Sequence, residues 1–380
     1  MGGELQLNLD ELGTPEWVRR ALIGLTLALI VFGLLAVYSA TSFQAEQSGL
    51  SGTTTLMDQI ARALAGGAAM MTAAYVDYRV WQRLAWPLMA VVGVLLVILV
   101  SPGTESFAPA VNGSRRWIAL GPATFQPSEL AKAAVVFWTA ALAVKKGEQI
   151  KDFRDGLLPF LVILLPVLFL INQEPHLSAT LITAGVAAAV LFSAGVRIRH
   201  GLALVAVAVP VVVMLVRQKG YQVERVMAFL DPTGTASDAA HQLRQAQIAI
   251  GAGGPFGAGY GQSTQKLYFL PEASNDFIFP IIAEEWGFAG AAGIVVLFLV
   301  WTMLGLRIAR SAPDRFGRLV GVGMTAIVFI GAFGHMGITM GLMPTTGVSL
   351  PFVSAGGTGL VTAMGATGVL LSISSRRRWA

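Results

Sequence analysis

The feature that most constrains the fold of this chain is a succession of apolar blocks, each close to the length of a membrane-spanning helix. A helix crosses the hydrocarbon core of a bilayer in roughly 20 predominantly apolar residues and satisfies its own backbone groups. The expected fold class is therefore an all-α polytopic membrane protein. We predict ten transmembrane helices, over residues 18–40, 56–76, 80–101, 128–146, 156–173, 176–195, 201–217, 277–307, 317–341 and 348–373.

The second predicted helix, 56–76, differs from the others in composition. It carries Asp58 and Arg62 near its start, together with many small residues. Charged side chains are costly in contact with lipid tails. We therefore expect this helix to pack against protein rather than against lipid.

The overall composition narrows the class of protein further. Of 380 residues, 55% are hydrophobic and 12% are charged, whereas a soluble domain carries about 25% charged residues. Cysteine is absent, which excludes disulfides and thiolate metal ligands, and the four scattered histidines argue against a zinc site. The net charge of +5 does not indicate a nucleic-acid partner, because most basic residues lie in short loops between apolar blocks. The first block is too long for a signal-peptide core, so we expect it to remain as an anchor.

Lysine and arginine gather in every second loop of the predicted topology, and such loops face the cytoplasm. With a cytoplasmic N-terminus, the cytoplasmic segments carry Arg19, Arg20, Arg79, Arg83, Lys145, Lys146, Lys151, Arg154, Arg197, Arg199, Arg307, Arg310, Arg315, Arg318, Arg376, Arg377 and Arg378. We predict that both termini are cytoplasmic. Residues 1–16 are expected to form a cytoplasmic tail, and residues 1–380 a single transmembrane domain.

Two predicted outer segments, 102–127 and 218–276, are too long to be simple turns. The second is a large extracytoplasmic loop between the seventh and eighth helices. Apolar residues at helical spacing between 238 and 250 predict a short helix lying at the membrane surface. Lysine and arginine are normally concentrated in cytoplasmic loops, so the basic residues of this outer loop need another explanation. They are Lys219, Arg225, Arg244 and Lys266.

Ionisable groups near the membrane are candidates for function, and the first cluster lies at the start of the fourth helix. Pro127 and Ser128 suit a helix start, with Ser128 as the expected N-cap. Glu129 and Lys132 are three residues apart and share a helix face. The cluster is either a capped helix with a local ion pair or an anion site. In an anion site, Arg116 and Lys132 would hold phosphate, and Glu129 would orient Lys132.

A second cluster, Lys266, Glu272 and Asp276, ends the large outer loop, and Asp276 directly precedes an apolar run. As a helix cap, Asp276 would accept backbone hydrogen bonds and have a low pKa. Facing an apolar cavity, it would have a raised pKa and act as a base. The residues alone do not separate these alternatives.

Two further segments are less informative. The turn 174–176 contains proline and is typical of an ordinary outer connection. The segment 342–359 contains two prolines and several glycines, so it is either a kinked loop or irregular backbone that lines a cavity.

Several long motifs, in order along nearly the whole chain, resemble the SEDS family of bacterial shape, elongation, division and sporulation proteins. They are residues 30–40, 112–118, 126–132, 269–272, 276–279, 283–287, 341–347 and 354–357. Residues 265–273 and 342–347 resemble the division branch more than the elongation branch. The chain departs from the family pattern at Ser274, Asn275, His176 and Ala355.

The resemblance implies a peptidoglycan glycosyltransferase that makes β-1,4 glycan strands from lipid II at the outer face of the cytoplasmic membrane. Asp276 matches the family's essential aspartate, which would act as the base of a single inverting displacement. Arg116, Lys132 and Lys266 suit the diphosphate leaving group. The expected substrate-binding set is Arg116, Glu129, Lys132, Lys266, Glu272 and Ser354.

The resemblance also bears on cofactors and partners. No cofactor is established by these residues. A divalent cation, Mg or Mn, could assist the reaction, but no carboxylate cluster is evident to hold one. The expected partners are membrane lipids, a class B penicillin-binding protein that acts as transpeptidase, and other proteins of the division or elongation complex. The alternatives are an elongation-type polymerase, a lipid II flippase, and a scaffold without activity of its own.

Overall fold

The computed structural model describes residues 14–47, 49, 52–104, 107–109, 114–121, 123–174, 177–235, 237–267 and 269–375. Most of the predicted cytoplasmic tail lies outside these residues. So do Asn112 and Gly113 of the first outer motif, Pro175 and His176 of the short outer turn, and the basic residues Arg376, Arg377 and Arg378.

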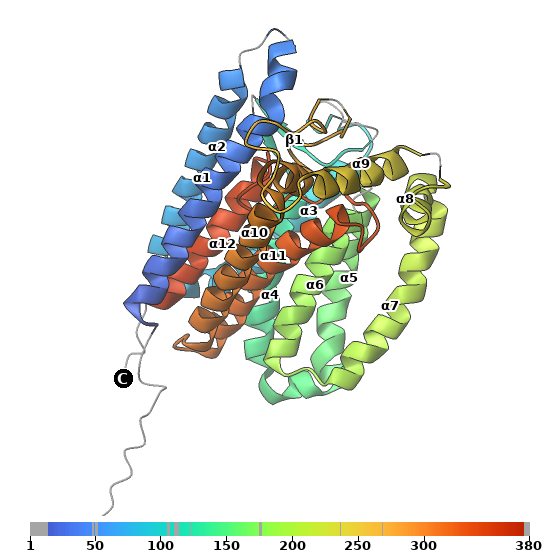
Figure 1. The fold of residues 1–380 in the computed structure, drawn as a ribbon. Coiled ribbons are helices and arrows are strands. Elements are labelled where there is room, and N and C mark those ends of the chain that lie inside the picture. The colour runs from blue at the N-terminus through green and yellow to red at the C-terminus, as the bar shows by residue number, and fades with distance from the viewer. Residues whose placement is uncertain are drawn as a thin grey trace, which may run out of the picture.

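The described residues form a bundle of long helices (Figure 1). The helices are α1 (Glu16–Gln47), α2 (Gly52–Tyr75), α3 (Tyr78–Val100), α4 (Pro127–Lys146), α5 (Leu158–Gln173), α6 (Leu177–Ala194), α7 (Ile198–Gln218), α8 (Gly220–Leu230), α9 (Asp238–Ala252), α10 (Ile278–Arg310), α11 (Arg315–Thr339) and α12 (Thr358–Ser375). A hairpin of β1 (Ile118–Leu120) and β2 (Ala123–Phe125) precedes α4, and two short turns, Gly147–Lys151 and Phe153–Leu157, join α4 to α5. The predicted all-α polytopic class is confirmed.

Within the described residues, nine helices are long and apolar enough to cross a membrane, and α2 is not among them. Its 24 residues give a length of about 36 Å at 1.5 Å per residue, which is sufficient to span a bilayer. Its buried residues Gln59, Gly66 and Ala73 recur every seven positions and form one face. That face packs on α12, where a β-carbon on Gly368 would meet Met70 and Ala73. α2 therefore packs against protein along this face, whereas Leu64, Met71 and Tyr75 are exposed, so the expectation holds for one face of the helix only.

Most predicted helix boundaries lie within a few residues of the observed ones, with three corrections. The last helix begins at Thr358 rather than at residue 348, because residues 342–357 around Pro344 and Pro351 are irregular. The outer loop contains the predicted helix 238–250 as α9, but α8 was not predicted. Ser128 is not the cap of α4, which begins at Pro127 after Gln126, and the Ser128 hydroxyl is buried without a hydrogen-bond partner.

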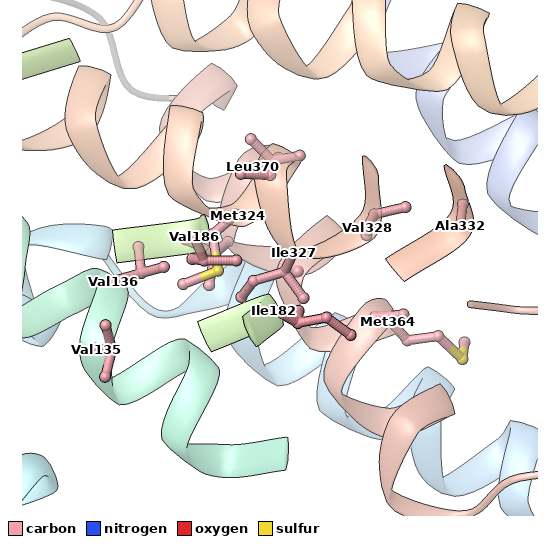
Figure 2. Packing of buried hydrophobic residues seen from close by; sticks show 14 of the residues in the cluster. Val135, Val136, Ile182, Val186, Met324, Ile327, Val328, Ala332, Met364 and Leu370 are labelled. Carbon is pink, nitrogen blue, oxygen red and sulfur yellow. The ribbon is translucent and has the colours of Figure 1, made fainter. Parts of the chain in front are cut away.

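Buried apolar side chains of α4, α6, α11 and α12 meet in the middle of the bundle (Figure 2). Val136 on α4 and Val190 on α6 close on Gly323 of α11, where a β-carbon would collide with both side chains. These helices therefore approach each other closely and form a rigid centre. By contrast, α7 has no buried residue and stands at the periphery (Figure 1).

One end of the bundle collects the basic loops. Asp314, before α11, accepts hydrogen bonds from Tyr78 Oη at 2.6 Å and from Arg79 Nε at 3.1 Å at the start of α3. Arg315 donates to the Ala194 carbonyl at the end of α6 at 3.0 Å. The ends of α2, α6 and α10 therefore meet at one side of the molecule, and the segments that hold the acidic candidates lie at the other.

Candidate active site

A cavity of about 1340 Å³ opens at the end of the bundle opposite the basic loops. Ligand sites of roughly 300–1,000 Å³ are usual, so this space accommodates large substrates. Its walls come from helix starts and from the loops before α4, α10 and α12. The charged or polar side chains that line it include Asp58, Arg62, Arg116, Gln126, Glu129, Lys132, Tyr221, Arg225, Glu272, Asn275 and Asp276.

Asp276 lies in the turn that leads into α10 and faces this cavity. Phe277 is the N-cap of α10, and no side-chain hydrogen bond caps the helix. Among the described residues, the Asp276 carboxylate has no ion pair. A β-carbon on Gly347 would lie 2.9 Å from Asp276 Oδ2, so the carboxylate rests against a residue without a side chain. The capping alternative for Asp276 is excluded.

The surroundings of Asp276 raise its pKa from 3.8 to about 6. Burial is the largest cause, because it disfavours the charged form, and the negative charge of Glu272 adds to it. Arg225 and Arg116 oppose the shift. The carboxylate is therefore ionised at pH 7 and is still a far better proton acceptor than an ordinary aspartate.

The backbone before Asp276 is held by a short tight turn and by the segment before α12. Glu272 has a positive φ of 55°, and its carbonyl accepts from the amides of Asn275 at 3.1 Å and Phe277 at 3.2 Å. Ser354 donates to the Asn275 carbonyl at 2.7 Å, and the amide of Ala355 donates to the Ser274 carbonyl at 2.9 Å. These contacts fix the direction in which Asp276 points.

The position of Ser354 requires a correction. Its hydroxyl also accepts from the Leu350 amide at 2.8 Å, and the side chain is buried away from the cavity wall. The sequence placed Ser354 in the substrate-binding set, but the structure places it behind Asn275. Through its hydrogen bond to the Asn275 carbonyl, Ser354 helps to hold Asp276 in position.

Glu129 and Lys132 form the expected contact on α4. Lys132 Nζ lies 2.7 Å from Glu129 Oε1, both side chains are about nine-tenths buried, and both residues line the cavity. Charge-assisted hydrogen bonds in such surroundings are stronger than exposed ones. Glu129 therefore holds the ammonium group of Lys132 in a defined place at the wall.

Arg116 reaches the cavity from the extended segment that enters the β1–β2 hairpin. Its Nε donates to the Glu174 carbonyl at 3.1 Å, which ties this segment to the end of α5. Burial lowers the pKa of Arg116, although a guanidinium stays charged at neutral pH.

Glu174 was not expected to be unusual, because it lies in an apparently ordinary turn. Its side chain is buried, and neither carboxyl oxygen has a hydrogen-bond partner. Burial raises its pKa to about 8, against an opposing effect of Arg116. Glu174 is therefore mainly neutral at pH 7 and does not cancel the charge of Arg116.

Lys266 does not reach the cavity, which corrects its predicted place beside the substrate. Its ammonium group donates to Ser39 Oγ at 3.0 Å, to the Gly261 carbonyl at 2.8 Å and to Glu285 Oε1 at 2.9 Å. An ammonium group has three donors, so all are used. The residue is 4% exposed and ties the outer loop to α1 and α10.

Of the ionisable residues that line the cavity, four were not assigned to a site from the sequence: Asp58 and Arg62 on α2, and Tyr221 and Arg225 on α8. The available signal for Arg225 was its basic charge in an outer loop, which topology did not explain.

Among the described residues, no group of three or more His, Asp or Glu side chains could hold a metal ion. Glu272 and Asp276 are adjacent carboxylates that could supply at most a partial set of ligands.

The fold and the cavity define a class of protein: a polytopic helical membrane protein with a large cavity, lined by acidic and basic side chains, at one end of the bundle. The family model described as "Cell cycle protein", for FtsW, RodA and SpoVE, matches residues 19–379. The chain belongs to this family, which confirms the resemblance found in its motifs.

Curated relatives match over nearly their whole length. A probable peptidoglycan glycosyltransferase FtsW of Geobacter sp. (strain M18) is 38% identical over 94% of this chain and 98% of its own. Stage V sporulation protein E of Bacillus subtilis (strain 168) is 36% identical over 94% of this chain and 97% of its own.

Solved structures agree with the fold. A chain in a structure described as a peptidoglycan synthase complex that coordinates polymerization and crosslinking is 27% identical, with a TM-score of 0.78 over 94% of this chain and 97% of that one. The rod shape determining protein RodA of Thermus thermophilus shares the fold at 24% identity, with a TM-score of 0.68 over 94% of this chain and 97% of its own.

Proposed function

We propose that this protein is a peptidoglycan glycosyltransferase that polymerises lipid II, with Asp276 as its catalytic base. One observation carries the proposal: the Asp276 carboxylate, which does not cap α10 and has a pKa of about 6, faces a cavity of about 1340 Å³ that is also lined by arginine and lysine side chains. The naming of full-length relatives as probable peptidoglycan glycosyltransferases supports the reaction.

The chemistry follows from the charges in the cavity. The donor sugar is joined through an α bond to a diphosphate, and the glycan has β-1,4 links, so one inverting displacement suffices. As the acceptor hydroxyl oxygen attacks the anomeric carbon, Asp276 takes its proton, and the bond to the diphosphate breaks. The electron pair leaves with the diphosphate. Arg116 and Lys132 stabilise that charge, so no general acid is needed.

The remaining predicted residues have separate roles. Glu129 orients Lys132, and Glu272 raises the pKa of Asp276 and lines the same cavity, where it is available to the substrate. Ser354 is a positioning residue, and Lys266 holds the outer loop in place. Neither is proposed to touch the substrate.

The location of the cavity supports an orientation. It lies at the end opposite the basic loops, and basic loops are cytoplasmic. We propose that the protein spans the cytoplasmic membrane with both termini inside and the cavity open to the outer side. Buried residues of every helix except α7 and α8 belong to one cluster, which supports a single transmembrane domain.

The comparisons also support a partner and a cellular role. A similar chain belongs to a complex that combines polymerization with crosslinking, so we propose a class B penicillin-binding protein as partner. The relatives named FtsW support a role in division. Lipid II and the other complex proteins complete the proposed partners.

The proposal is tested with purified protein, with and without the partner, supplied with lipid II in detergent and in vesicles. We expect glycan strands that lysozyme digests. Lipid II that crosses the vesicle bilayer without forming strands, under all these conditions, would indicate a transporter and overturn the proposal.

A further inference from the structure

A second, smaller pocket of about 40 Å³ adjoins the large cavity. Four residues line both spaces: Arg116, Ser178, Tyr221 and Arg225. The other walls of this side pocket come from the ends of α6 and α7, from α8, and from residues 344–346. The side pocket is therefore a recess of the proposed active site with both polar and apolar walls, and it has no assigned ligand.

Two guanidinium groups from separate segments meet at this recess. Arg116 precedes β1, and Arg225 lies on α8, with its guanidinium carbon 5.8 Å from the centre of the Tyr221 ring. Arg225 forms no ion pair with any residue that the structure describes. The positive charge of Arg225 repels that of Arg116 and contributes, with burial, to the lowered pKa of Arg116. An anion between them would relieve this repulsion.

A buried hydroxyl provides an independent indication of a ligand. Thr345 is 3% exposed, its Oγ1 has no hydrogen-bond partner, and the residue lines the side pocket. Buried polar groups are nearly always paired. On α8, which also lines the pocket, Gln222 donates to Tyr221 Oη at 2.9 Å and so constrains the orientation of a second hydroxyl.

The size and the chemistry of the recess select one kind of group. One water needs roughly 10–15 Å³ of such space, so about 40 Å³ suits a single tetrahedral group and excludes a sugar ring. Paired guanidiniums with hydroxyl donors match phosphate oxygens. Leu177 on α6 and Val216 on α7 add apolar walls that suit the first carbons of a lipid chain.

We propose that the side pocket formed by Arg116, Arg225 and Thr345 binds a phosphoryl group of a polyprenyl diphosphate. The identity of the diphosphate as that of the lipid-linked sugar rests on the proposed function. Arg116, shared by both spaces, connects the recess to the cavity where Lys132 and Asp276 lie. Arg225 is then a substrate-binding residue distinct from the pair on α4.

The test measures binding of farnesyl diphosphate to the full-length protein in detergent by calorimetry, without any polymerisation. We expect Arg225→Ala to weaken binding by about tenfold or more and Thr345→Val by several-fold. Arg225→Lys, which keeps the charge, should recover part of the affinity. Arg217→Ala removes an equally basic but exposed residue of α7 outside the pocket and should stay within about twofold of the wild type.

Two further ligands distinguish the sources of a phosphate. Inorganic diphosphate should compete with farnesyl diphosphate in the wild type, whereas phosphatidylglycerol should not. Unchanged farnesyl diphosphate binding by Arg225→Ala, or equal competition by phosphatidylglycerol, would overturn the inference. Binding that depends on Arg225 in a protein that makes no glycan would preserve the inference and contradict only the proposed function.

Discussion

At the scale of single residues, the site depends on how the environment of one carboxylate is arranged. Burial and the negative charge of Glu272 raise the pKa of Asp276, whereas Arg225 and Arg116 lower it and so favour the ionised form. A residue that caps α10 would have had the opposite shift. The sequence placed Asp276 at a helix start, but the absence of a cap depends on backbone direction, which residue type does not determine.

The pKa of Asp276 predicts the pH dependence of polymerisation. The pKa is raised from 3.8 to about 6, so the base is active above pH 6 and is lost as the pH falls through that value. We expect kcat/KM to be halved near pH 6 and to fall about tenfold per pH unit below it. A profile that stays flat down to pH 4.5 would contradict the assignment.

Gly347 provides a steric test at the same scale. A β-carbon there would lie 2.9 Å from Asp276 Oδ2, whereas a β-carbon on Gly356, also in the cavity wall, would meet nothing within 4 Å. We expect Gly347→Ala to displace the carboxylate and lower kcat by about tenfold to a hundredfold, because small misplacements are costly. Gly356→Ala is the matched control and should keep nearly full activity. Equal rates for both variants would show that the contact is unimportant.

At the scale of elements, the positions of α1, α3–α7, α10 and α11 follow from apolar runs of spanning length, and α2 was predicted from a less apolar block. The start of α12 and the existence of α8 do not follow from such runs. Irregular backbone after Pro344 delays α12 until Thr358, and α8 is short and mixed in composition. Similarly, Arg116, Glu129, Lys132 and Glu272 reach the cavity with Asp276 as expected, whereas Lys266 folds back onto α1. Which way a loop lysine turns depends on a distant partner such as Glu285.

The Lys266–Glu285 pair predicts a stability effect without a direct effect on binding. Lys266→Met removes the cation beside the buried Glu285 carboxylate, which keeps hydrogen bonds from Ser39 Oγ and the Ser263 amide. Removing one partner of a buried ion pair costs roughly 3–5 kcal/mol. We expect a clearly lowered melting temperature, while farnesyl diphosphate affinity of the folded fraction is retained. Lys151→Met, which breaks the exposed pair with Glu148, should leave the melting temperature nearly unchanged. Loss of affinity at unchanged stability would restore Lys266 to the substrate site.

At the scale of the whole molecule, the helices place two chemically different ends on opposite sides of the bundle. The basic loops meet at one end through contacts such as Asp314 with Tyr78 and Arg79. The cavity occupies the other end, with walls from α2, α4, α6, α8 and the segments before α10 and α12. Under the proposed function, this separation would confine the reaction of lipid-linked sugars to one side of the membrane.

The absence of cysteine makes the orientation directly testable. Thr233→Cys, exposed between α8 and α9, and Lys145→Cys, exposed at the end of α4, each introduce a single thiol. In intact cells whose outer barrier is permeabilised, we expect an impermeant maleimide to label the first and not the second. The reverse pattern would place the cavity in the cytoplasm and contradict the proposed orientation.

The central claim is that Asp276 is the base for glycan formation, and polymerisation of lipid II by purified Asp276→Asn tests it most directly. The matched control is Glu224→Gln, an exposed carboxylate on α8 outside the cavity. We predict that Asp276→Asn folds with an unchanged melting profile and loses about a hundredfold to ten-thousandfold in rate, while Glu224→Gln polymerises normally. Wild-type rates from a folded Asp276→Asn protein would contradict the account.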